Sequence, residues 1–349
     1  MVEQCGLLRA ICTLQRSQIV IINYHRIAPD DPAAEPLFED ALFGPSQSGF
    51  ELQVRWLRQH FDVINESELI QLTRASTFRG RYAAITFDDG YRDNYTLAYP
   101  VLKACSTPAI YYICPRLIDT SRVGWWDLAA YLAKRTAKRS ISIAGKTFSA
   151  DVDRRHVIRY LCDLVKSCKS GEPDALLDDL FRTCDVPMPD ARLQSEQFMT
   201  WDQIREVGRQ GIAIGSHTYT HRILSSLDET AQQWEMKQSK QSIEGHTGQR
   251  VRTLAYPVGG YEQFTPATMR LAEESGYEAA FSFHTGTNYP GRIHPYNVKR
   301  IASTNSLDPM FTCGAYFPEV FPWFRPAPRD YTCDGSARNP LTVSRFEAQ

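Results

Sequence analysis

The chain has 349 residues, with 39 basic and 40 acidic side chains, so its formal net charge is −1. This length can bury a large core and fits one large domain or two small ones. Because no block of like charge stands out, the chain lacks the basic surface typical of nucleic-acid binding, and nucleic acid is not an expected partner.

The nine cysteines form no Cys-x-x-Cys pair, and their spacing is irregular. This pattern favours free thiols in a reducing compartment over a disulfide framework. Residues 5–14 are only weakly apolar and are interrupted by Arg9, unlike a secretory signal. No run approaches the ~20 apolar residues of a membrane span. We therefore predict a cytoplasmic protein.

The first predicted element is a short N-terminal helix with an apolar stripe. We expect it to pack on the body of the protein, and peripheral contact with a membrane surface is the alternative reading. Peripheral membrane contact is also the alternative for a polar insertion at about 119–197, which is described below. The stripe consists of Leu7, Leu8, Ile11 and Leu14.

Short apolar runs of strand length recur along the chain. They are rich in Ile, Val, Tyr and Phe, and several are apolar throughout, as expected when both faces of a sheet are covered. The predicted strands are 19–22, 61–64, 83–87, 109–113, 212–215, 251–256, 279–283 and 298–301.

Helices are predicted between these strands. Thr200 and Gln203 form a capping box at the start of one of them, and Gly211 stops it. Strands that alternate with helices imply a parallel sheet or a β/α barrel. The predicted helices cover 50–61, 200–210, 225–245 and 266–276.

Two segments differ from this alternation. Residues 119–197 are mostly polar and helical in pattern, and we interpret them as an insertion in the barrel. The tail after Asn305 is rich in proline and aromatic residues and is predicted to be irregular. We therefore predict one domain over 1–305, with the insertion at about 119–197, and a tail over 306–349.

Two short motifs carry the chemistry, and each follows a predicted strand. Asp88 and Asp89 lie at the end of an apolar run, and His217 and His221 are four residues apart. Because strand ends converge on one face of a β/α barrel, these side chains can meet. One carboxylate and two imidazoles suit a hydrolytic zinc, and the second carboxylate suits an attacking water.

Each motif alone has a simpler reading. Asp88 and Asp89 could form a solvated turn, and histidines four residues apart are often core residues. The metalloprotease pattern His-Glu-x-x-His does not apply, because Thr218 stands where its glutamate would be. Two aspartates that end a buried strand are, however, costly unless they are paired or bound to metal.

Thr-Phe-Asp-Asp-Gly-Tyr at 86–91 and His-Thr-x-x-His at 217–221 together resemble the first two motifs of the polysaccharide deacetylases, the NodB-homology or carbohydrate esterase 4 group. The resemblance spans about 19–301 but not the details of the insertion or the tail. It implies a distorted (β/α)7 barrel, a divalent metal such as zinc, and hydrolysis of an N-acetyl, less often O-acetyl, group on a sugar. Segments similar to one subgroup are Tyr24-His25-Arg26, Trp125-Trp126-Asp127, Ala255-Tyr256-Pro257 and Arg300-Ile301.

The resemblance also implies roles for individual residues. Asp89, His217 and His221 would bind the metal, and Asp88 would be the general base. The backbone N–H of Tyr91 would stabilise the oxyanion, as preorganised donors do in acyl transfer.

The general acid is less clearly marked. The larger family takes it from a Leu-x-x-His motif, to which only the segment ending at His284 is loosely similar. His25 follows the predicted strand 19–22, at its mouth, and we prefer it as the acid, with His284 as the alternative. A simple strand-capping role for His25 is the third reading.

Three further residues are secondary candidates. Arg300 could orient Asp88, because the family's usual Arg-x-x-Pro-Tyr arginine is absent from this chain. Tyr256 is a candidate for oxyanion or substrate contact, and Asp202 is a further candidate residue without an assigned role. The family's later Asp-x-x-Asp-Trp motif is also not evident.

The leading hypothesis is a metal-dependent hydrolase that removes an acetyl group from an N-acetylated sugar. The predicted cytoplasmic location suggests an intermediate of polysaccharide or glycolipid biosynthesis as substrate. A non-catalytic carbohydrate-binding relative and an amidase of a non-sugar amide are the alternatives.

Overall fold

Seven parallel strands close into a barrel in the computed structural model of the chain. The structure describes residues 17–31, 36–138, 140–143, 146–149, 154–166 and 173–316. The predicted N-terminal helix and the tail beyond residue 316 lie outside these residues. Closure comes from β1, which pairs with β5 on one side and with β12 on the other. The barrel strands, in order, are β1 (Gln18–Tyr24), β5 (Arg81–Phe87), β6 (Ile110–Ile113), β9 (Ala213–Ser216), β10 (Thr253–Ala255), β11 (Ala279–Thr285) and β12 (Val298–Ala302).

The barrel is distorted, as the family resemblance implies. The pairing of β11 with β12 shifts register between Phe281 and Thr285. An eighth strand, β4 (Asp62–Val63), pairs with the first half of β5, while β6 pairs with its last two residues. All eight predicted strands are present, and the predicted (β/α)7 barrel is confirmed.

Alternation along the strands decides which side chains enter the barrel. In β1, Val20 and Ile22 belong to the large core between the strands and the helices, whereas Ile19 and Ile21 belong to a smaller cluster inside the barrel. Successive side chains of a strand point to opposite faces, so Asn23 follows Ile21 into the interior.

The helices around the barrel match most of the sequence predictions. The capping box of Thr200 and Gln203 opens α9 as expected. Helix α10 begins at Glu229, after its N-cap Asp228, and thus four residues later than predicted. The surrounding helices are α2 (Gln47–His60), α3 (Glu66–Arg74), α4 (Tyr99–Ala104), α9 (Trp201–Arg209), α10 (Glu229–Thr247) and α11 (Pro266–Glu274).

The tail contains one helix, α12 (Pro309–Tyr316), so the prediction of irregular structure is wrong for these residues. The Asp308 carboxylate accepts a hydrogen bond from the backbone N–H of Phe311. Phe311 is buried, and its ring packs edge-on against Trp56 of α2. A cap and one buried aromatic side chain therefore stabilise a helix that proline content alone argued against.

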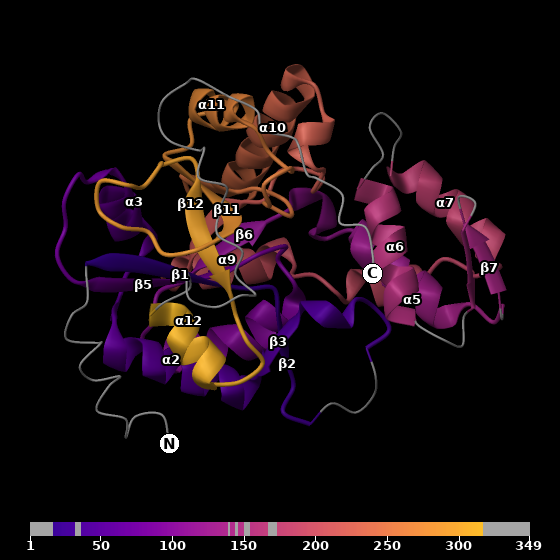
Figure 1. Cartoon of the computed structure of the whole chain (residues 1–349), viewed down its shortest axis with the longest axis horizontal. Coiled ribbons are helices and arrows are strands. Elements are labelled where there is room, and N and C mark those ends of the chain that lie inside the picture. Colours follow the sequence, from indigo (N-terminus) through magenta and orange to yellow (C-terminus); the bar gives the residue numbers. More distant parts are fainter. Residues whose placement is uncertain are drawn as a thin grey trace, which may run out of the picture.

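The chain between β6 and β9 forms a lobe beside the barrel (Figure 1). Its main helices are α5 (Trp125–Arg135), α6 (Arg154–Lys166) and α7 (Pro173–Cys184), and both α6 and α7 pack on α5. A short helix, α8 (Ala191–Ser195), leads back to the barrel. We call residues 119–197 the lobe; its assignment as an insertion in one domain over 1–305 stays a prediction.

Two small sheets were not predicted from the sequence. An antiparallel hairpin of β7 (Ser140–Ile143) and β8 (Lys146–Ser149) belongs to the lobe. A parallel pair of β2 (Arg26–Ala28) and β3 (Phe43–Ser46) lies outside the barrel sheet. No helix in the described part of the chain has the length and apolar character needed to cross a bilayer.

Candidate active site

The two predicted motifs meet at the carboxyl ends of the barrel strands. Asp89 follows β5, and His217 and His221 follow β9. Nε2 of His217 lies 3.4 Å from Asp89 Oδ1, and Nε2 of His221 lies 3.3 Å from the same oxygen. All three side chains are buried, and their ligand atoms lie within 4.8 Å of one another. The structure therefore brings together the three residues predicted to bind metal.

The geometry of this cluster fits a divalent ion. Asp89 Oδ1 is buried and makes no hydrogen bond, which is costly for a carboxylate oxygen without a further partner. Two ligand atoms that are each ~2.0–2.1 Å from a tetrahedral zinc lie about 3.3 Å apart. The observed separations of 3.4 and 3.3 Å match that spacing.

The ring of His217 is set up as a metal ligand. Its Nδ1 lies 2.8 Å from the carbonyl oxygen of Ala255, at the end of β10. Because a carbonyl can only accept, Nδ1 carries the proton and Nε2 keeps its lone pair. Burial lowers the pKa of His217 to about 4, so the ring is neutral at neutral pH, which is the form that binds metals.

Unusual backbone conformations aim these side chains. Asp89 has a φ of 72° and is followed by Gly90 with a φ of 85°. Thr218 and His221 also have positive φ, at 60° and 58°. Such values are strained for a β-branched residue such as threonine, and they concentrate at functional sites. The two histidines thus converge through a loop and not on the face of a helix.

A buried glutamate on α10 holds this loop in place. Glu235 accepts hydrogen bonds from the backbone N–H groups of Tyr219 and Thr220, at 2.9 and 2.8 Å. It also accepts one from the Thr220 hydroxyl. The sequence analysis missed Glu235, because nothing in its local pattern distinguishes it from other glutamates of an amphipathic helix.

Asp88 lies beside the cluster and is held by Arg300 of β12. The Asp88 oxygens accept from Arg300 Nη1 at 2.7 Å and Nη2 at 2.8 Å. Asn23 of β1, which the sequence analysis also missed, donates to Asp88 Oδ2 at 3.1 Å and accepts from Arg300 Nη1 at 2.7 Å. Burial alone would raise the pKa of Asp88, but the charge and hydrogen bonds of Arg300 outweigh it and hold that pKa below its ordinary value.

The two candidate general acids lie in different surroundings. His25, at the end of β1, has Nε2 4.0 Å from Asp88 Oδ2, and its side chain is 26% exposed. His284 is buried, and its ring stacks on Tyr261 and Phe264. Burial lowers the pKa of His284 to about 4. The structure brings His25 to Asp88 and packs His284 among aromatic side chains.

Tyr91 connects the site to the lobe. Its hydroxyl donates to Asp127 at 2.8 Å and accepts from the indole N–H of Trp126 at 2.6 Å. The Trp126 ring lies against His221, with ring centroids 4.2 Å apart. Burial raises the pKa of Asp127 to about 6. The backbone N–H of Tyr91 makes no hydrogen bond within the described residues, so it is available to a ligand.

Two secondary candidates are not brought to the cluster. The hydroxyl of Tyr256 donates to the carbonyl of Tyr296, and its ring stacks on Phe264. Asp202 lies on the outer surface of α9 and pairs with Arg205. Neither side chain has the position expected of a substrate contact, because each already serves packing or a surface ion pair.

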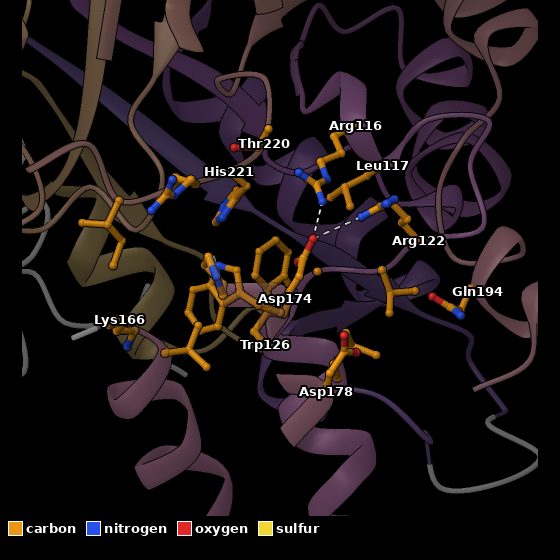
Figure 2. A pocket seen from close by; sticks show the side chains of 18 of the residues that line it. Arg116, Leu117, Arg122, Trp126, Lys166, Asp174, Asp178, Gln194, Thr220 and His221 are labelled. Atoms are coloured by element: carbon orange, nitrogen blue, oxygen red, sulfur yellow. Dashed lines mark hydrogen bonds and ion pairs between the residues drawn. The ribbon is translucent and has the colours of Figure 1, made fainter. Parts of the chain in front are cut away.

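A cavity of about 590 Å³ opens next to the cluster. His221 and Trp126 line it on the barrel side, and Arg116, Arg122 and Asp174 line it further along (Figure 2). The cavity therefore connects the predicted metal site with the lobe.

Comparison with known proteins identifies the family. Residues 75–156 and 184–280 match the family model described as polysaccharide deacetylase. YxkH of Bacillus subtilis (strain 168), whose name places it among these deacetylases, is 24% identical over 278 residues. That match spans 79% of this chain and 68% of YxkH. A Staphylococcus aureus (strain N315) protein named poly-beta-1,6-N-acetyl-D-glucosamine N-deacetylase is 28% identical over 106 residues, which span 28% of this chain and 37% of that protein.

Solved structures agree on the fold. The Streptococcus pyogenes deacetylase PplD superimposes with a TM-score of 0.57 and 17% identity, covering 86% of this chain and 99% of PplD. IcaB from Ammonifex degensii gives a TM-score of 0.51 and 20% identity, covering 86% of this chain and 98% of IcaB.

Proposed function

Because the chain belongs to the polysaccharide deacetylase family, whose members hydrolyse N-acetyl groups of sugars, we propose that it is a metal-dependent N-deacetylase acting during polysaccharide or glycolipid biosynthesis. One observation carries the proposal: Asp89 Oδ1 lies 3.4 and 3.3 Å from the Nε2 atoms of His217 and His221, with the Asp88 carboxylate held beside them by Arg300.

Asp89, His217 and His221 are the proposed ligands of a divalent ion, most simply zinc. Such an ion, when bound, activates water and polarises the acetyl carbonyl. Asp88 is the proposed base that accepts the proton of the attacking water. Its lowered pKa keeps it ionised at neutral pH, and Arg300 fixes both of its oxygens.

The developing oxyanion needs a hydrogen-bond donor that is already in position. The Tyr91 N–H suits this role, because it has no other acceptor within the described residues. The peptide plane that carries this N–H is held in place, because the Gly90 carbonyl in the same peptide unit accepts a hydrogen bond from the backbone N–H of Met199 at 3.0 Å. Preorganised donors of this kind commonly contribute a factor of about 10²–10³ to kcat.

The departing amine needs a proton, and His25 is the better placed donor. It lies at the strand mouth beside Asp88 and is partly exposed, so it can exchange protons with solvent. A pKa of about 4 leaves His284 uncharged at neutral pH, so it has no imidazolium proton to donate. The non-catalytic alternative is disfavoured, because every proposed ligand and the base are present and converge.

Acetate release tests this proposal. We expect the purified chain with zinc to release acetate from N-acetylglucosamine oligomers, chelation to abolish release, and added zinc to restore it. The β-1,6-linked oligomers belong in the panel because of the name of the Staphylococcus aureus relative. Absence of acetate from every N-acetyl sugar, by a protein that carries its metal, would refute the proposal and favour a non-sugar amide.

A further inference from the structure

The cavity beside His221 continues well beyond the predicted metal site. Its volume of about 590 Å³ falls in the ~300–1,000 Å³ range of pockets that take drug-sized ligands, which is more than an acetyl group requires. It lies between the lobe and α10, and we call it the lobe pocket. Its lining residues include Trp125 at the start of α5, Trp234 on α10, and the Arg116, Arg122 and Asp174 group.

Two tryptophans give the lobe pocket flat apolar surfaces. Trp125 is partly buried, and its ring centroid lies 6.5 Å from that of His221. Trp234 is 51% exposed, the largest aromatic side chain among the exposed hydrophobic residues of the described chain. The ring of Tyr219 packs edge-on against Trp234, with centroids 5.4 Å apart, which limits its movement. Tyr219 belongs to the loop that carries both histidines.

Fixed polar groups accompany the tryptophans. Figure 2 shows the guanidinium groups of Arg116 and Arg122 converging on the Asp174 carboxylate of α7. The Arg116 pair joins the segment after β6 to the lobe, and the Arg122 pair lies within the lobe; both present N–H and carboxylate groups to the pocket. The residues lining the pocket include four basic and three acidic side chains, so their charges nearly balance.

The tryptophans and the charged side chains of the lobe pocket together favour one class of ligand. Nearly balanced charge disfavours a polyanion, and seven charged residues in the lining disfavour a lipid chain. A neutral sugar chain fits both features, because each ring offers a C–H face to an aromatic surface and hydroxyl groups to fixed polar side chains.

We propose that the lobe pocket binds the sugar rings next to the acetylated one, with Trp234 stacking on one of them. The lobe pocket would then determine how much more tightly this protein binds an oligosaccharide than a single sugar. This inference rests on the proposed function, since it assigns substrate recognition to the same site.

Substitution of Trp234 tests the inference with N-acetylglucosamine and its β-1,6-linked tetramer as substrates. We expect Trp234→Ala to raise KM for the tetramer roughly three- to tenfold, the scale of one aromatic contact, and to leave its kcat and monosaccharide turnover unchanged. Trp234→Phe should restore most of the loss. The matched control is Leu52→Ala, because Leu52 is 55% exposed on α2 and lies outside the pocket.

Two outcomes would overturn the inference: unchanged tetramer KM in Trp234→Ala, or equal loss for monosaccharide and tetramer. Thermal unfolding and metal content verify that the variant is folded. If no N-acetyl sugar releases acetate, the proposed function fails, and calorimetric titration of the full chain with the tetramer decides the inference separately. Tetramer binding that Trp234→Ala weakens and Leu52→Ala does not would support it, and absence of binding would refute it.

Discussion

Arg300 binds both oxygens of Asp88, at 2.7 and 2.8 Å, although the two residues are 212 positions apart in the chain. The pair is buried, and Arg300 Nε is also fixed by the carbonyl of Ser282 at 3.0 Å. A planar guanidinium held at three points allows the carboxylate one orientation. We therefore regard Arg300 as the residue that positions the proposed base.

Arg300→Lys should separate positioning from charge. Lysine keeps the positive charge but cannot bind both oxygens at once, so Asp88 should lose its fixed orientation. We expect kcat to fall by on the order of 10², the scale of a misplaced catalytic group, while metal content stays unchanged. Steady-state kinetics and metal analysis check this. Arg252→Lys is the matched control, because Arg252 makes a similar two-point pair with Glu278. Full activity of Arg300→Lys would contradict the positioning role.

Asp88→Asn and His217→Ala should differ in metal content. Asp88→Asn removes the proton acceptor but keeps the shape, so the protein should retain its metal while turnover falls by roughly 10² or more. His217→Ala removes a ligand, and both metal and activity should be lost. Metal analysis of the two purified variants checks the contrast. Loss of metal from Asp88→Asn would make Asp88 a ligand, and a His217→Ala protein that keeps its metal would show that the ligand assignment is wrong.

Glu235→Ala should weaken metal binding although Glu235 is not a proposed ligand. It removes the acceptor for two backbone N–H groups of the loop between His217 and His221. Loss of such supporting contacts typically costs about 10–100-fold in metal affinity. Glu235→Gln keeps one acceptor oxygen and should retain most of the affinity. Competition with a chelator measures both. Equal affinity of Glu235→Ala and the unmodified protein would mean that the loop holds its shape without this carboxylate.

The strands could be predicted because they are buried on both faces and form continuous apolar runs in the sequence. Every residue of β1 is buried, for example. These runs left a parallel sheet and a β/α barrel open, and the (β/α)7 barrel was predicted from the family resemblance of the two motifs. The metal cluster was predictable because its motifs follow two such strands. Asn23 and Glu235 could not be predicted, since each acts through a contact that forms only in the folded chain. Asn23 donates to Asp88, and Glu235 accepts from the backbone of Tyr219. The β7–β8 hairpin was missed because two four-residue strands give too short a pattern.

The choice between His25 and His284 could not be made from sequence either, because the two side chains differ in how deeply they are buried. A proton donor must reach both the leaving amine and solvent, and only His25 combines proximity to Asp88 with partial exposure. The positions of the two histidines in the chain do not reveal their burial. In the structure, the aromatic rings stacked on His284 explain why it is buried.

His25→Ala should therefore harm amide substrates more than activated esters. An amine leaves poorly as an anion, so its protonation must accompany collapse of the tetrahedral intermediate, and a positioned acid typically contributes about 10²–10⁴-fold. Aryl acetates carry a leaving group that needs no proton, so their hydrolysis isolates this role. We expect His25→Ala to lower kcat for an N-acetyl sugar by at least tenfold more than for p-nitrophenyl acetate, with metal content unchanged. His284→Gln, tested alongside, should show no such difference between the two substrates. If His25→Ala slows both substrates equally, His25 supports the structure and does not donate the proton. If His284→Gln alone shows the selective loss, the general acid is His284, and its burial must be relieved when substrate binds.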